Sequence, residues 1–448
     1  MNTKIFKVYL LVPSLLFLFS FHAQAETISV DCDAGDKLAD AVDTVAPGST
    51  ILVSGTCHES ITIRKNDLTL VGNDNIHDTK ATISGVHFPP RVPLSLFEVD
   101  GAVRISIVGF ILEKAFFGIN AKGNASVSLT DLHVNNNFIG VNITTNSSAL
   151  LKDIDITATE PGAMVLGLGL SDNAVANVDG TVNMSGSVAF GFDITASSLQ
   201  LNSSRSPETD VVFNSFNNTL GGEIAIGSTF FANRGSTVNI HDNATIGFSC
   251  NTGSTCMFFH AKLNSKNNGL DGVDVVSRGN LNLDGNSTMA STNNGREGIS
   301  IDDSTLNLFG FFADPGLPNI ISTDNTNNGV LVEFGGKLDV GRNSSIEAKF
   351  NGDAGVRLDD GSSAIIQRGE ITDNAGMIKE SHETEDSDED GESSRHHTAD
   401  VIATFGSRIS FRQNPDTAGI VTPNIVGKAV CDRTSMARGD VKCKRRKF

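Results

Sequence analysis

Three carboxylates recur at one position of a short repeat and are the residues best suited to binding a metal ion. The repeat reads glycine, apolar, any residue, apolar, and the fourth residue after the glycine is Asp302, Glu333 and Asp359 in three successive copies. Like charges at neighbouring strand positions repel, and a hard cation such as calcium, which takes several carboxylate oxygens, would relieve that repulsion. The alternative is that these acids only end strands and face water, as Asp before Gly often does.

The repeat itself predicts the elements that position these carboxylates. Adjacent copies lie 22 to 31 residues apart, with about three short strand-type segments in each interval. A period of this length is typical of a solenoid whose apolar side chains fill a narrow core. Asparagines in equivalent turns would then form side-chain amide ladders. The copies considered begin at Gly118, Gly140, Gly191, Gly272, Gly298, Gly329 and Gly355.

The N-terminal segment predicts a cap for this solenoid. Over Asp36–Ala46, apolar residues recur at helical spacing, and Pro47-Gly48 follows as a stop signal. The end of a solenoid exposes unpaired strand edges, which a short helix would cover. We therefore expect an N-terminal cap over residues 26–49.

The same segment resembles a known superfamily. The strings Cys32-Asp-Ala-Gly, Pro47-Gly48-Ser-Thr-Ile-Leu-Val and Gly55-Thr-Cys57-His-Glu resemble the opening of right-handed parallel β-helix proteins of the pectin-lyase-like superfamily. The resemblance runs over most of residues 26–430. It implies an all-β fold, a single-stranded right-handed parallel β-helix over residues 50–430. The superfamily includes pectate and pectin lyases, polygalacturonases, pectin esterases, alginate epimerases and phage tailspikes.

Most catalytic strings of that superfamily are absent. The Gly-His-Gly and Arg-Ile-Lys of polygalacturonases, and the Gln-Asp-Thr-Leu and Gly-Arg-Pro-Trp of pectin esterases, do not occur. Calcium-dependent β-helix lyases hold calcium with acidic residues and remove a proton with Arg or Lys. On that resemblance, Asp302, Glu333 and Asp359 would be calcium ligands, and Arg357 or Arg296 would be the catalytic base.

The first 25 residues predict a cleaved signal peptide. Lys4 and Lys7 precede an apolar run, and Ala23-Gln24-Ala25 supplies small residues for cleavage. We expect an exported protein, periplasmic or extracellular, with no membrane span in the mature chain. Removal of the leader also removes Tyr9, the only tyrosine of a chain that has no tryptophan.

Six cysteines in an exported chain indicate disulfides. Proximity along the chain favours three local pairs out of fifteen possible connectivities. These pairs are Cys32–Cys57, Cys250–Cys256 and Cys431–Cys443.

The charge distribution limits the partners. With 34 Lys and Arg against 52 Asp and Glu, the net charge of −18 argues against binding to nucleic acid, which needs a basic face. Residues 380–397 include an acidic run that cannot bury a core, so we expect a disordered loop there. Residues 431–448 form a basic, cysteine-bearing tail.

Two functions remain open. The first is an exported, non-catalytic β-helix that presents a repeat surface for a polysaccharide or a cell-surface glycan. The second is a calcium-dependent polysaccharide lyase acting on a uronate glycan. The missing catalytic strings favour the first, and the three stacked carboxylates with Arg357 favour the second.

Overall fold

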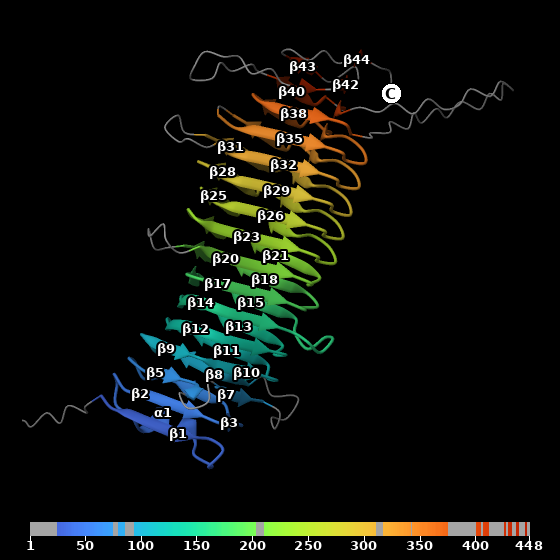
Figure 1. Ribbon diagram of the computed structural model, residues 1–448. Coiled ribbons are helices and arrows are strands. Elements are labelled where there is room, and N and C mark those ends of the chain that lie inside the picture. The colour runs from blue at the N-terminus through green and yellow to red at the C-terminus, as the bar shows by residue number, and fades with distance from the viewer. Residues whose placement is uncertain are drawn as a thin grey trace, which may run out of the picture.

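Strands of the chain stack into three parallel ribbons that run along the long axis of the molecule (Figure 1). Successive coils add strands to these ribbons, and the all-β parallel β-helix expected from the sequence is confirmed. The computed structural model describes residues 25–374 except 75–78, 86–93, 203–209, 311–316 and 342, then 400–411 except 405, and 425–426, 429–431, 436–438 and 444–445.

Sheet B is the ribbon that carries the candidate site. It has 15 strands, and its strands pair in parallel with the coils before and after. Its strands are β4 (Ile61–Ile63), β8 (Ser95–Asp100), β11 (Phe117–Lys122), β13 (Ile139–Ile143), β15 (Leu166–Leu170), β18 (Phe190–Thr195), β21 (Leu220–Ala225), β24 (Phe248–Cys250), β27 (Val273–Val276), β30 (Ile299–Asp302), β33 (Val330–Glu333), β36 (Val356–Leu358), β39 (Val401–Ala403), β42 (Ala429–Cys431) and β44 (Lys444–Arg445).

The remaining strands form a second sheet, whose register divides it into two ribbons. Ribbon 1 contains β1 (Thr27–Asp31), β2 (Thr50–Ser54), β5 (Thr69–Val71), β9 (Ile105–Val108), β16 (Val175–Val178), β19 (Ser198–Leu201), β22 (Thr229–Ala232), β25 (Thr255–Phe259), β28 (Asn280–Asp284), β31 (Thr305–Phe309), β34 (Lys337–Val340), β37 (Ser363–Ile366), β40 (Arg408–Phe411) and β43 (Met436–Arg438). Ribbon 2 contains β3 (Thr56–Cys57), β7 (Thr79–Ser84), β10 (Phe110–Glu113), β17 (Thr181–Ser185), β20 (Val211–Phe216), β23 (Ser236–His241), β26 (Lys262–Lys266), β29 (Thr288–Thr292), β32 (Asn319–Thr323), β35 (Ser345–Lys349), β38 (Gly369–Thr372) and β41 (Ile425–Val426).

Two long strands, β12 (Ser126–Asn135) and β14 (Ser148–Thr157), belong to both ribbons. Each contains an aspartate with positive φ, Asp131 at 56° and Asp153 at 54°. Asp and Asn tolerate this left-handed conformation better than most residues, so the strand can turn there from one ribbon to the next. The short strand β6 (Asn73–Asp74) pairs antiparallel with β7.

Apolar side chains on the inner faces of the ribbons form one continuous core. On sheet B, the first residue after the repeat glycine points inward, and Val273, Ile299 and Val330 are in register and fully buried. The repeat glycines themselves sit at a crowded corner. A Cβ atom on Gly272 would collide with the Ser291 hydroxyl and the Gly298 carbonyl.

Buried asparagines link successive coils, as the Asn-rich turns predicted. The backbone N–H of Asn268 donates to Oδ1 of Asn294 at 3.1 Å, and the backbone N–H of Asn294 donates to Oδ1 of Asn325 at 3.1 Å. The same side chains are joined by amide–amide hydrogen bonds of 3.1 and 2.9 Å. The ladder continues through Asn218, Asn243, Asn351 and Asn374 to Asp400.

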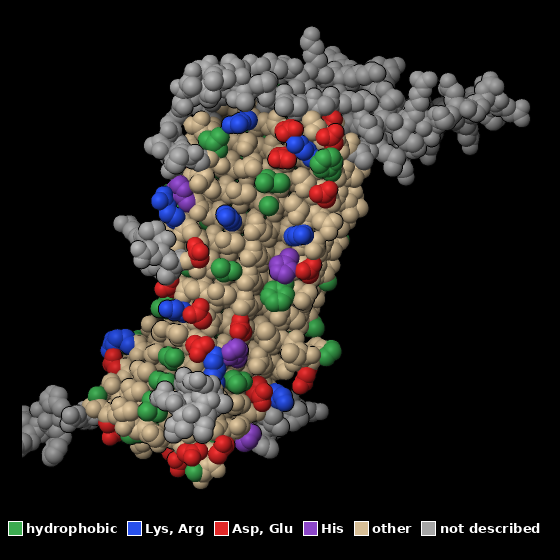
Figure 2. Space-filling view, in the orientation of Figure 1, with side chains coloured by type: hydrophobic (Ala, Val, Ile, Leu, Met, Phe, Trp, Pro, Cys, Tyr) green, Lys and Arg blue, Asp and Glu red, His purple; other side chains and the backbone are tan. Residues whose placement is uncertain are grey.

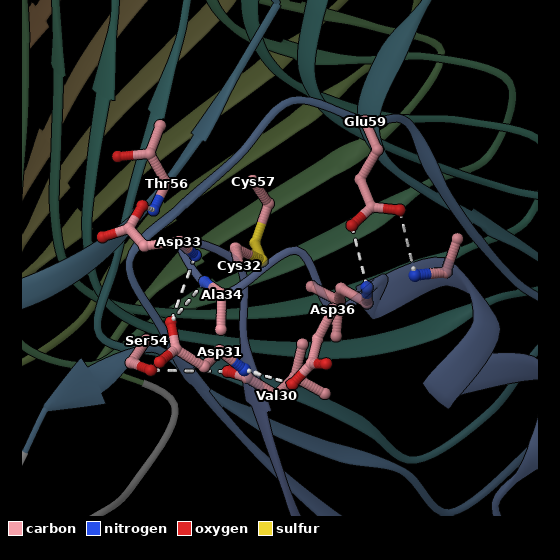
Figure 3. Close-up of a disulfide and its surroundings, with 12 residues drawn as sticks. Val30, Asp31, Cys32, Asp33, Ala34, Asp36, Ser54, Thr56, Cys57 and Glu59 are labelled. Carbon is pink, nitrogen blue, oxygen red and sulfur yellow. Dashed lines mark hydrogen bonds between the residues drawn. A yellow bond between two sulfur atoms is a disulfide. The ribbon is translucent and has the colours of Figure 1, made fainter.

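A short helix, α1 (Leu38–Thr44), lies at the N-terminal end of the solenoid (Figure 1). Leu38 and Val42 are buried against the first coils. The Glu59 carboxylate accepts hydrogen bonds from the first backbone N–H groups of the helix, at 2.8 Å from Leu38 and 3.2 Å from Ala39 (Figure 3). Strand β1 comes before the helix and pairs with β2, so the segment assigned to the cap also contributes a strand to ribbon 1.

Two of the expected disulfides are confirmed. Cys32 and Cys57 are bonded with their Cα atoms 5.1 Å apart (Figure 3), and Cys250 and Cys256 with theirs 6.4 Å apart. Cys431 is also disulfide-bonded. Its expected partner, Cys443, lies outside the described residues.

Other expectations concern segments that the structure does not describe. The signal peptide, apart from Ala25, and the acidic loop over 380–397 both lie outside the described residues. Among the described residues, none of the helices combines the length and the apolar character that a membrane span requires.

Candidate functional site

The register of sheet B places the three carboxylates in neighbouring coils. Val276 pairs with Asp302, and Asp302 pairs with Glu333. Asp359 directly follows Leu358, which pairs with Val332, and its backbone N–H donates to the Val332 carbonyl at 2.8 Å. The alignment of the repeats on their leading glycines therefore holds across the 31-residue interval from Gly298 to Gly329. Residues 311–316 of this interval lie outside the described residues.

Glu333 lies between two like charges. Burial raises the pKa of its carboxyl group, and the carboxylates of Asp302 and Asp359 raise it further. Burial also raises the pKa of Asp302, which has Asp303 beside it. Within the described part of the chain, the carboxylates of Asp302 and Glu333 make no hydrogen bond or ion pair. Their oxygens are therefore available to a ligand.

Asp359 differs because its oxygens are already engaged. Its Oδ2 accepts from Nε of Arg357 at 2.7 Å, and its Oδ1 accepts from the Thr404 hydroxyl. Arg357 also reaches Oδ2 of Asp353 at 3.2 Å. Burial opposes the charge on Arg357, but the carboxylates of Asp359 and Asp353 outweigh it and raise the guanidinium pKa. A guanidinium with a raised pKa stays protonated, so it is less available to act as a general base.

Arg296 is held in a second ion pair, with Asp271, and its charge also lowers the pKa of Glu333. Its Nε donates to Oδ1 of Asp271 at 2.7 Å, and its terminal nitrogen donates to the other oxygen of the same, fully buried carboxylate. The hydrogen bonds to Asp271 raise the pKa of Arg296. Asp271 also accepts the backbone N–H of Glu297 at 3.0 Å, so this acid links one coil to the next.

Two of the three carboxylates at this position make no hydrogen bond among the described residues, and the third already accepts hydrogen bonds. Asp302 and Glu333 present oxygens of the type that calcium prefers. Asp359 could contribute only if its hydrogen bonds to Arg357 or Thr404 were exchanged. Among the described residues, Asp302, Glu333 and Asp359 do not bring an oxygen from each within 4.8 Å of the other two, so all three could share one cation only after their side chains move.

A second polar line on the outer face of sheet B was missed in the sequence. It consists of the second residue after each repeat glycine, and each member pairs in register with the member in the next coil. The line runs through Asp193, Glu223, Ser249, Asp274, Ser300, Leu331 and Arg357. The signal was present in the repeat, because Asp193 and Asp274 occupy the same position after Gly191 and Gly272.

Asp274 is the most perturbed acid of this line. Only 9% of the residue is exposed. Burial raises its pKa to about 7, with added repulsion from Asp271 and Asp302, against the lowering effect of Arg296. Asp193 and Glu223 are partly buried, and burial raises their pKa values as well. A carboxyl group near neutrality can exchange a proton at physiological pH.

Two exposed phenylalanines lie at the turns before and after sheet B. Phe334 follows Glu333 and is 58% exposed, and Phe350 follows β35 and is 59% exposed. Both have positive φ, 49° and 56°. The positions equivalent to Phe334 in the preceding and following repeat copies hold Asp303 and Asp360, which are also left-handed. A bulky residue with positive φ is an outlier. Core packing does not account for these two phenylalanines either, because both side chains are largely exposed to solvent.

Comparison with known proteins finds no matching family model and no matching curated protein. Solved structures that are similar to this chain include an alginate lyase from Paenibacillus sp. str. FPU-7, at 15% identity and a TM-score of 0.41, covering 60% of this chain and 95% of that one. The catalytic domain of a GH87 α-1,3-glucanase in complex with nigerose has 11% identity and a TM-score of 0.37, with 76% and 66% covered. PfbA, a surface adhesin of Streptococcus pneumoniae, has 9% identity and a TM-score of 0.30, with 78% and 91% covered. At 9 to 15% identity and TM-scores of 0.30 to 0.41, these similarities assign no activity to this chain, so a function must be argued from its own side chains.

Proposed function

We propose that this protein is an exported, non-catalytic β-helix that binds a polysaccharide or cell-surface glycan along the outer face of sheet B. The observation that carries the proposal is the pair of polar lines on that face, which place carboxylate and guanidinium groups in register over successive coils. Equivalent groups recur at the strand spacing of about 4.8 Å, which suits an extended, repetitive ligand.

The side chains are suited to recognition of sugar hydroxyls. The free carboxylates of Asp302 and Glu333, which are partly exposed, can accept hydrogen bonds from sugar hydroxyls. Phe334 offers an exposed ring beside Glu333, which an apolar sugar face can cover. The absence of tryptophan, and of tyrosine after residue 9, leaves phenylalanine as the large aromatic residue for this contact.

The engagement of both arginines supports a non-catalytic role. Arg296 and Arg357, the two candidate bases, each make two hydrogen bonds to carboxylates and have raised pKa values. A lyase needs a base that can accept a proton near the operating pH. Both arginines are instead paired with carboxylates, Arg296 with the buried Asp271 and Arg357 with the partly buried Asp353 and Asp359.

Binding to a glycan panel tests this proposal. We expect the mature chain, residues 26–448, to bind at least one glycan, and Glu333→Gln or Phe334→Asn to weaken that binding about tenfold. Asparagine tolerates the left-handed conformation at position 334, so Phe334→Asn should not lower the melting temperature. The matched control is Phe309→Ala, which removes a ring that is 48% exposed on ribbon 1.

Equal weakening by Phe309→Ala and Phe334→Asn would contradict the placement on sheet B. Failure of every glycan to bind would contradict the function itself.

The second candidate function, a calcium-dependent lyase on a uronate glycan, is supported by the register of Asp302, Glu333 and Asp359. Those residues would hold calcium, which supplies neutralisation of a substrate carboxylate. If this function is correct, Asp359→Ala should abolish both thermal stabilisation by calcium and the rise in ultraviolet absorbance that β-elimination produces. Asp339→Ala, on ribbon 1 of an adjacent coil, is the control and should preserve both. Unchanged calcium stabilisation in Asp359→Ala would count against the calcium site.

A further inference from the structure

A cleft of about 400 Å³ lies on the outer side of ribbon 1, away from sheet B. It crosses four consecutive coils through strands β9, β12, β14 and β16. Its volume falls within the range of small-molecule sites, about 300 to 1,000 Å³. The residues that supply its polar and apolar groups are Arg104, Ser106, Ser126, Ser128, Ser148, Leu150 and Asn177.

The parallel register explains why the cleft is lined by hydroxyl groups. Ser106 pairs with Ser128, and Ser126 pairs with Ser148. Each serine points outward, because its neighbours in the strand, such as Ile105 and Val127, are buried in the core. The same outward line continues through Leu150 and Asn177. Short serine side chains next to longer ones leave the surface hollow at this point.

The hydrogen-bonding groups of the cleft are available to a ligand. In the described chain, the side chains of Ser106, Ser126, Ser128, Ser148 and Asn177 make no hydrogen bond. Each serine hydroxyl is both a donor and an acceptor, and the asparagine amide supplies both kinds of group. The groups stand at the strand spacing of about 4.8 Å between coils.

The cleft carries no unbalanced charge. Arg104, at its edge, is paired with Asp67, whose carboxylate accepts from Nε and, at 2.7 Å, from the terminal nitrogen. Leu150 is 37% exposed and adds an apolar contact among the hydroxyls. A ligand that matches this lining is uncharged, carries several hydroxyl groups and has an apolar face.

We propose that this cleft on ribbon 1 binds a neutral saccharide of a few sugar rings through Ser106, Ser126, Ser128, Ser148 and Asn177. The site is independent of sheet B, because it lies on a different ribbon and uses none of the carboxylates described above. The protein would then contact carbohydrate at two places along one solenoid.

Isothermal titration of the mature chain with neutral trisaccharides (cellotriose, maltotriose, mannotriose and xylotriose) tests the inference. Ser128→Phe fills the cleft and should weaken the tightest of these ligands at least tenfold. The control, Ser363→Phe, places the same ring at an outward, half-buried position of β37 on the same ribbon and should leave the affinity unchanged. If Ser128→Phe fails to fold, the double variant Ser126→Ala, Ser148→Ala removes two hydroxyls without adding volume and should also weaken binding.

Two results would overturn the inference. One is no detectable binding of any trisaccharide at millimolar concentration. The other is an affinity that neither Ser128→Phe nor the double alanine variant changes. Glu333→Gln should leave this affinity intact, so a failure here is distinguishable from a failure of the glycan-binding function assigned to sheet B.

Discussion

Asp274 is an acid whose environment opposes its charge. Its pKa is raised to about 7 by burial and by Asp271 and Asp302, while Arg296 lowers it. The folded state therefore holds a proton that the unfolded chain, with an ordinary aspartate pKa of about 4, releases. The stability associated with that proton is present below pH 4 and is lost as the pH rises to about 7.

Replacement of Asp274 by Asn should remove this loss of stability at high pH. We expect Asp274→Asn to increase the free energy of unfolding at pH 8 by up to about 4 kcal/mol, since one pKa unit corresponds to about 1.4 kcal/mol, and to change it little at pH 4. Urea denaturation between pH 4 and pH 8 measures the difference. The control Asp172→Asn, at an exposed left-handed turn, should leave the pH profile unchanged. If Asp274→Asn changed the free energy of unfolding by the same amount at every pH, the raised pKa of Asp274 would be contradicted.

At this scale the sequence was only partly informative. The fourth position after each glycine could be aligned, and the structure brings Asp302 and Glu333 into register as that alignment required. The partner of Arg296 could not be predicted, because Asp271 lies 25 residues earlier, in the preceding coil. Burial of Asp274 also depends on the neighbouring coils rather than on its own segment.

The coils are held together by the buried asparagine ladder as well as by the strands. Asn294 is 1% exposed, and its side chain donates to Ser291 at 3.1 Å and to Asn325 at 2.9 Å while accepting the backbone N–H of Asn268. Removal of the amide would leave buried partners unsatisfied, which costs about 1 to 3 kcal/mol for each group. The ladder thus fixes the turns that lead into the sheet B strands from β21 to β36.

Asn294→Ala should lower the free energy of unfolding by about 3 kcal/mol. Asn282→Ala is the matched control, because Asn282 is half-buried on the outside of ribbon 1 and accepts one side-chain hydrogen bond from Asn307. The control should cost about 1 kcal/mol or less. Chemical denaturation of both variants measures the difference, and equal losses would show that the ladder contributes no more than a surface amide.

The sequence predicted which strands, helix and turns form better than it predicted the long-range contacts that they make. The alternation of apolar residues and the Asn-rich turns predicted the strands and the amide ladder, and both are confirmed. The helix expected over Asp36–Ala46 is shorter, Leu38–Thr44, and is joined to Glu59 from a later part of the chain. Such a long-range contact leaves no local pattern, and neither does the serine cleft, which depends on four coils aligning their outward positions.

Different surfaces of the molecule carry different sets of charged and uncharged side chains. Figure 2 shows acidic and basic side chains scattered in small groups over the visible face, with uncharged side chains between them. Sheet B instead concentrates acids in two lines, and the cleft on ribbon 1 is uncharged. A solenoid repeats these surfaces along its length, and such extended surfaces can bind an extended ligand.

The central claim is that sheet B binds glycan without cleaving it. The most direct measurement saturates the mature chain with a uronate glycan that it binds, with calcium and then with a chelator, and follows ultraviolet absorbance over time. The background is low because the chain after residue 25 has neither tyrosine nor tryptophan. We predict bound glycan and a flat absorbance trace. A calcium-dependent rise that Asp359→Ala abolishes would contradict the account and identify the protein as a lyase.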